Sequence, residues 1–181
     1  MNRRHVVAAL IAVALFELVA CGQSTHGTAT PGTSAGRPAT TGGASTTSLQ
    51  PCDLLTSADA SALQLTAQGG PTNFGGARTC EWRKPVDING QNGFSTRIAI
   101  RDSQSLSDIT SAGYTVTQDN VGSHQGKQAA LDGGGGCLIA IAVSNTSRVD
   151  VDISGGTDTA SSCQFANQVA KVVEPHLPSG S

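Results

Sequence analysis

The sequence predicts an α+β domain, an antiparallel sheet of about five strands with a helix at each end of the domain and two disulfides. Three observations predict this fold class. Short segments in the second half of the chain alternate apolar and polar residues, as strands of a half-buried sheet do. Helix-start patterns stand before the first and after the last of these segments. Four of the five cysteines lie in the same region, an even number that fits a disulfide framework.

The opening helix is predicted to start at Thr56. Thr56 and Asp59 have the spacing of a capping box, with Asp in place of Glu, and lead into the segment 60–65. The run Gly69-Gly70-Pro71 then ends the helix, because glycine and proline are poor helix formers.

Five segments are predicted to be strands: 80–83, 97–101, 114–117, 137–143 and 148–153. In the second segment, Ile98 and Ile100 face a core and the flanking arginines face outward. The fourth segment is apolar on both faces, which places it centrally in the sheet. Turn residues 144–147 join it to the fifth segment as a hairpin, and the glycines 133–136 are read as another hairpin connection rather than an anion-binding loop.

The closing helix is predicted over residues 159–174. Ser161 or Ser162 can cap its start, and Pro175 follows its end. One of its two apolar stripes carries a cysteine, so the helix packs on the sheet with Cys163 facing inward.

The core is thin, with 28 Leu, Ile, Val and Phe among residues 49–177, so covalent support is expected. The cysteines contain no C-x-x-C pair and only two histidines lie in the domain, so we expect neither a metal nor a cofactor. We expect the bonds Cys52–Cys80 and Cys137–Cys163, because consecutive elements are usually neighbours. The main rival joins Cys52–Cys163 and Cys80–Cys137, and loop entropy favours it by only about 1 kcal/mol per bond.

The first residues predict export and lipid attachment. Residues 1–20 have the layout of a signal peptide, with two arginines before an apolar run of about eleven residues, too short to span a bilayer. Leu18-Val19-Ala20-Cys21 resembles the bacterial lipobox, so Cys21 is the expected lipidation site. More than one acyl chain on that residue would give stable membrane attachment.

The domain organisation follows from composition. Residues 21–48 are expected to be the lipidated cysteine and a disordered Thr/Ser/Gly tether, since 24 of residues 22–48 are Gly, Ala, Ser, Thr or Pro. Residues 49–178 form a single domain, and residues 179–181 are a tail. The expected location is the extracytoplasmic face of the cell membrane, with the membrane as a partner through the Cys21 anchor. A net charge of −2 argues against nucleic acid as a partner.

Few residues suggest chemistry. Asp150 and Asp152 share one strand face, which fits a cation site, an acid–base pair, or a solvated face paired with Arg97 and Arg101 on another strand; we favour the last. His124 lies in a segment of loop composition and could belong to a catalytic triad, although an exposed loop histidine is the simpler interpretation. Trp82 is interpreted as core packing rather than a ligand platform. Residues 32–36 match G-x-S-x-G, but in low-complexity sequence, where the motif has no meaning.

The motifs together resemble a known family. Besides the lipobox, they are the opening Pro-Cys-Asp-Leu-Leu-Thr at 51–56 and Cys80-Glu81-Trp82. This pattern is similar to the actinobacterial cell-envelope lipoproteins classed as a domain of unknown function, and it covers essentially the whole chain. The resemblance implies location and architecture and carries no catalytic residues. We therefore expect a non-enzymatic binding or accessory module for an envelope protein or small ligand; the alternative is an extracytoplasmic hydrolase that uses His124.

Overall fold

One antiparallel sheet of seven strands organises the part of the chain that the computed structural model describes, residues 44–88 and 93–179. The strands are β1 (Gly70–Phe74), β2 (Ala77–Lys84), β3 (Phe94–Arg101), β4 (Tyr114–Val121), β5 (His124–Leu131), β6 (Cys137–Ser144) and β7 (Ser147–Ser154). Their order is β1-β2-β3-β7-β6-β5-β4, so all neighbours are consecutive in the chain except β3 and β7. Two meanders therefore meet along the β3–β7 pair.

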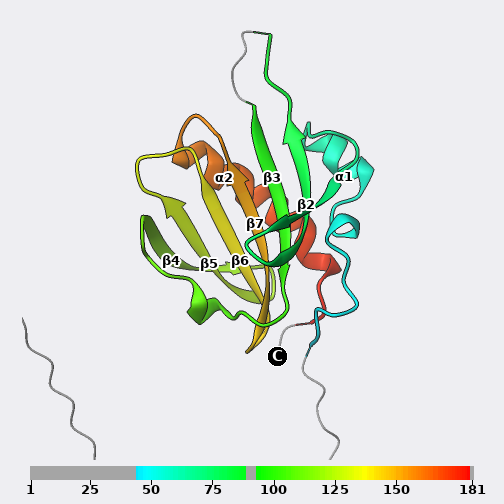
Figure 1. The fold of residues 1–181 in the computed structure, drawn as a ribbon, viewed down its shortest axis with the longest axis vertical. Coiled ribbons are helices and arrows are strands. Elements are labelled where there is room, and N and C mark those ends of the chain that lie inside the picture. The colour runs from blue at the N-terminus through cyan, green and yellow to red at the C-terminus, as the bar shows by residue number, and fades with distance from the viewer. Residues whose placement is uncertain (1–43, 89–92, 180–181) are drawn as a thin grey trace, which may run out of the picture. The chain divides into compact units, whose positions relative to one another are not determined.

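Helix α2 (Thr159–Val173) covers one face of the sheet and lies behind it in Figure 1. Alternation along the strands buries one set of side chains under this helix. These are Ile98 and Ile100 of β3, Ile139 and Ile141 of β6, and Val149, Val151 and Ile153 of β7. The helix contributes Cys163, Ala166, Ala170 and Val173 from the expected stripe, together with Val169. The inward faces predicted for these segments are confirmed.

Short N-terminal elements close the same core beside β2. A 3-10 turn (Pro51–Asp53) is followed by α1 (Ser57–Ala62), whose capping box between Thr56 and Asp59 is formed as expected. Trp82 is buried in the core cluster with Leu54 and Leu55, which confirms its interpretation as a packing residue.

Two disulfides connect these elements to the sheet. Cys52 of the 3-10 turn is bonded to Cys80 of β2, and Cys137, the first residue of β6, is bonded to Cys163 of α2. This is the pairing preferred on the ground that consecutive elements are neighbours.

The expectation of about five strands is wrong, because β1 and β5 were not recognised. Segment 70–74 begins with Gly70 and Pro71 of the expected helix stop, and all of its residues are exposed at the edge of the sheet, so no alternation marks it. Segment 124–131 begins with what reads as loop composition. Gly126 lies within it because a Cβ there would stand 2.7 Å from the carbonyl oxygen of Ala140, so this glycine marks a close approach of two strands.

The expectation of a helix at each end of the domain is also wrong. The opening helix is only six residues long and the fold is mostly β, with a long helix at the C-terminal end alone. Asp158, rather than Ser161 or Ser162, caps α2, and its side chain accepts a hydrogen bond from the backbone N–H of Ser161.

The segment just before the expected domain start at residue 49 contacts the sheet. Thr46 is buried, its hydroxyl donates to Asp102 at 2.7 Å, and Arg78 donates to the carbonyl oxygens of Thr46 and Leu49. The expected signal peptide, Cys21, residues 22–43 of the tether and the last two residues of the tail lie outside the described residues.

Candidate functional site

The face of the sheet opposite α2 contains a pocket of about 220 Å³. Its lining includes Phe74 of β1 and Tyr114 of β4, which are the two outermost strands. A flat sheet would hold these residues far apart, so strong curling of the sheet brings its two edges to one hollow. The chain between β3 and β4 adds Ile109 and Thr110 to the wall.

Small side chains make the hollow. Ala99 of β3 and Ala129 of β5 line the pocket, where the neighbouring positions on the same face carry Arg97, Arg101 and Lys127. Leu138, paired with Ala129, adds an apolar surface between them. The exposed aromatic rings at the two edges therefore border a depression that two alanines leave open.

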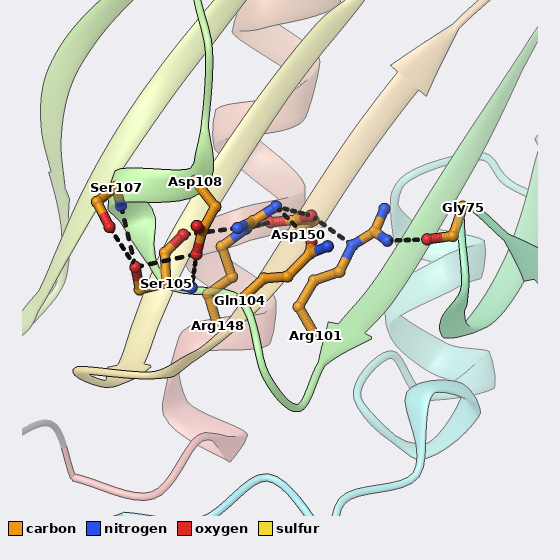
Figure 2. Close-up of polar contacts among 8 residues, drawn as sticks. All are labelled: Gly75, Arg101, Gln104, Ser105, Ser107, Asp108, Arg148 and Asp150. Carbon is orange, nitrogen blue, oxygen red and sulfur yellow. Dashed lines mark hydrogen bonds and ion pairs between the residues drawn. The ribbon is translucent and has the colours of Figure 1, made fainter. Parts of the chain in front are cut away.

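Four charged side chains form the polar floor of the pocket. Three of them, Arg101, Arg148 and Asp150, are joined by the hydrogen bonds that Figure 2 shows. Asp150 accepts from Arg101 Nε at 3.1 Å through Oδ2 and from Arg148 Nε at 2.7 Å through Oδ1. Arg148 and Asp150 are only 5% and 2% exposed. Charges buried to this degree need paired partners, and both carboxylate oxygens of Asp150 have one.

The same arginines hold the segments that border the pocket. Arg148 Nη1 donates to the carbonyl of Ser105 at 2.6 Å and its Nη2 contacts Gln104, both in the β3–β4 connection. Arg101 Nη1 donates to the carbonyl of Gly75, in the turn between β1 and β2. Figure 2 shows these bonds, and Nη2 of Arg101 has no partner among the described residues.

A second charged group lies beside the first. Arg97 bonds Glu81 through Nε at 2.9 Å and Asp152 through Nη1 at 2.8 Å, and the ring of Phe74 stacks on its guanidinium at 4.5 Å. Burial raises the pKa of Asp152 above its ordinary value, against the lowering effect of Arg97. Burial acts on Glu81 in the same sense, but its bonds from Arg97 and Ser95 prevail and hold its pKa below the ordinary value.

The cross-strand pairing expected for the four charges is confirmed, since Arg97 bonds Asp152 and Arg101 bonds Asp150. The solvated face is wrong for Asp150, because the β3–β4 connection and Arg148 cover it. No group of three or more His, Cys, Asp or Glu in the described ranges is arranged to hold a metal ion.

His124 is not the exposed loop residue that its surroundings in the sequence suggest. It is the first residue of β5 and is buried. Nδ1 lies 2.9 Å from Glu174 and Nε2 lies 2.9 Å from the carbonyl of Pro178. Ser123 approaches the same Nδ1 at 3.5 Å, whereas a triad places serine and acid on opposite ring nitrogens. The histidine thus fastens the end of α2 to the β4–β5 turn.

Glu174 is the acceptor at the centre of that contact. Its Oε1 accepts from the backbone N–H and the hydroxyl of Ser123, each at 3.0 Å, as well as from His124. The Ser123 backbone bond first, and then the bonds from the two side chains, hold the pKa of Glu174 below its ordinary value.

Sequence reasoning missed the main lining residues of the pocket. The sequence predicts only strand positions for Tyr114 and Arg148, and it assigns Phe74 to no element. Phe74 has no apolar neighbour at alternate positions, but Tyr114 has Ala112 and Val116 there, so no shared pattern marks the aromatic pair. Nothing local indicates that the two rings come together.

These features define a disulfide-bonded antiparallel β-sheet protein with one face covered by a helix and a pocket on the other. A family model described as "Protein of unknown function (DUF3558)" matches residues 17–176, and the chain belongs to this family. Comparisons with curated proteins and with solved structures give no match. Within residues 44–88 and 93–179, no helix has the length and apolar character needed to cross a membrane.

Proposed function

We propose that the protein is a membrane-anchored extracytoplasmic lipoprotein that acts as a non-enzymatic binding module. The lipobox that ends at Cys21 supports the anchor, and the family match begins at residue 17, so it includes that cysteine. A lipid at Cys21 would hold the domain at the outer face of the cell membrane.

The pocket on the uncovered face is the observation that carries the binding function. It combines apolar walls with a few fixed polar groups, which is the composition of small-ligand sites. Its charges are held by hydrogen bonds to two surrounding segments, so the site is formed before a ligand arrives.

The alternative, a hydrolase that uses His124, gains no support from the geometry. Both ring nitrogens of His124 are already occupied by Glu174 and Pro178, and Ser123 shares a nitrogen with the acid. A general base needs a free nitrogen directed at its nucleophile.

Thermal unfolding of the full chain with a panel of small amphipathic compounds, acidic, neutral and basic, tests the proposal. Ligands that bind the folded state raise the unfolding temperature by mass action. Ala129→Leu should abolish these shifts, because the larger side chain fills the hollow. Ala142→Leu is the matched control, since Ala142 lies on the same face, opposite Arg148, outside the pocket lining.

Compounds that stabilise the wild type and Ala142→Leu but not Ala129→Leu would support binding in the pocket. If no compound of any charge type shows this difference, the pocket is not a binding site and the proposed function is wrong.

A further inference from the structure

We propose that the pocket binds a small organic carboxylate, with the carboxylate on Arg101 and a compact apolar body between Phe74 and Tyr114. This inference rests on the proposed function and specifies the chemistry of its ligand. Three observations support it. Arg101 has a donor without a partner among the described residues, both oxygens of Asp150 already accept hydrogen bonds, and the pocket has the size of a small ligand.

Arg101 leaves one donor at the pocket without a partner in the described part of the chain. Arg101 Nη2 has no acceptor among the described residues, although its other two nitrogens are bonded. Tyr114 and Thr110 also line the pocket, and their hydroxyls, which can donate or accept, have no hydrogen-bond partner in that part of the chain. Guanidinium N–H groups can only donate, so the complementary ligand group is an acceptor.

A cationic ligand does not fit the same floor. Both oxygens of Asp150 already accept hydrogen bonds from arginines, so this carboxylate has no free side to offer. Asp152 has one oxygen bonded to Arg97, and the positive charge of Arg101 also acts on it. Because the four charges that line the pocket balance, selectivity depends on directed donors rather than on net charge. A carboxylate uses a directed guanidinium better than a neutral acceptor does.

The apolar walls and the volume of the pocket determine the size and character of the rest of the ligand. A closed cavity of about 150 Å³ holds benzene, and drug-sized ligands occupy roughly 300 Å³ or more. At about 220 Å³, this pocket accommodates a ring or branched chain with a short acidic arm. Phe74 and Tyr114 are 44% and 37% exposed, so a ligand body between them would remove aromatic surface from water.

The experiment compares three compounds of one shape on the full chain purified in detergent, by equilibrium dialysis. They are 3-phenylpropanoate, 3-phenylpropanamide and 3-phenylpropylamine. We expect the acid to bind about tenfold or more tightly than the amide, as a charge-assisted hydrogen bond does, and the amine to bind most weakly. Ala129→Leu should abolish binding of all three.

Two charge variants assign the contact to Arg101. Arg101→Gln should reduce the affinity for the acid to that for the amide, while Asp150 keeps its bonds from Arg148. Lys127→Gln is the matched control, because Lys127 lies on the same face of β5 but outside the pocket lining. An equal loss in both variants would mean that the general field, not Arg101, attracts the acid, and would overturn the assignment.

The ligand series in the wild type decides the charge preference even if Arg101→Gln does not fold. If the amide or the amine binds as tightly as the acid, and Ala129→Leu removes that binding, the carboxylate inference is wrong and the proposed function stands. If no compound binds in a manner sensitive to Ala129→Leu, and the panel of mixed charge also gives none, the proposed function fails with it.

Discussion

The carboxyl group of Glu174 occupies the space that a side chain at position 122 would need, and that position is Gly122. A Cβ added to Gly122 would stand 2.4 Å from Cδ of Glu174, and Gly122 has a φ of +57°. The β4–β5 turn therefore wraps the end of α2 as closely as a glycine backbone allows, and Glu174 bonds Ser123 and His124 from that position.

We expect Gly122→Ala to destabilise the domain in two ways. A left-handed backbone conformation costs about 1–2 kcal/mol for a residue with a Cβ, and the methyl group also displaces the Glu174 carboxylate. Gly113→Ala is the control, because Gly113 also has a positive φ but nothing lies within 4 Å of its added Cβ. Chemical denaturation should show a larger loss of unfolding free energy for Gly122→Ala than for Gly113→Ala. In a Glu174→Ala background, the two glycine substitutions should cost the same. Equal losses at 122 and 113 would mean that the contact with Glu174 contributes nothing.

Glu174 should make the stability depend on acid pH. Hydrogen bonds from Ser123 and His124 lower its pKa in the folded state, so its contribution is fully present above about pH 4.3. That contribution is lost as pH falls through the lowered folded-state pKa. The difference in unfolding free energy between wild type and Glu174→Gln should shrink over this range in a denaturation series. A difference that stays constant down to pH 2 would contradict the assignment.

Asp152 should have the opposite pH dependence. Burial raises its folded-state pKa, so the native state holds this proton more tightly than the unfolded chain, whose Asp pKa is about 3.9. Its effect on stability is therefore most favourable at low pH and declines as pH rises through the raised value. Asp152→Asn should gain stability relative to wild type across that interval and keep a constant difference above it. A relative loss with rising pH would show that pairing with Arg97 outweighs burial.

Both disulfides should matter to a core this thin. Each closes a loop with a sequence separation of 28 or 26 residues, worth about 3.5 kcal/mol by loop entropy. Replacing Cys137 and Cys163 together by alanine should lower the unfolding free energy by that amount.

Peptide mapping without reductant should yield a fragment that links Cys52 to Cys80, and a fragment that links Cys52 to Cys163 would refute the pairing.

Cys21 should carry the lipid. Radiolabelled palmitate should enter the wild type but not Cys21→Ala, and the variant should leave the membrane fraction. Equal labelling of both proteins would exclude lipidation at this residue.

The sequence was most informative where two consecutive strands both show strong alternation of apolar and polar residues. The hairpin of β6 and β7 was placed correctly because Ile139, Ile141, Val149 and Val151 repeat with period two and turn residues separate the strands. Strand β5 escaped detection because Gly126, which the close approach of β6 requires, looks like a loop residue. Strand β1 escaped because an exposed edge strand has no buried face to mark.

The candidate site divides in the same way. Cross-strand pairing of Arg97 and Arg101 with Asp150 and Asp152 could be predicted, because both sets alternate along their strands. The individual partners depend on the register of β3 against β7, which the sequence does not show. The pocket could not, since it depends on sheet curvature that brings Phe74 to the region of Tyr114. Curvature is a property of the whole sheet and leaves no mark on either segment.

The Cys52–Cys80 bond has a mechanical consequence for a domain pulled from its N-terminal side. A pulling force first meets non-covalent contacts, namely the hydrogen bonds of Arg78 to Thr46 and Leu49 and the packing of Leu49 against the core. Once these break, residues 44–51 can straighten to a span of at most about 28 Å. At Cys52 the load then passes through a covalent bond into β2, an inner strand of the sheet. The N-terminal segment therefore extends only as far as Cys52, where the disulfide stops further extension.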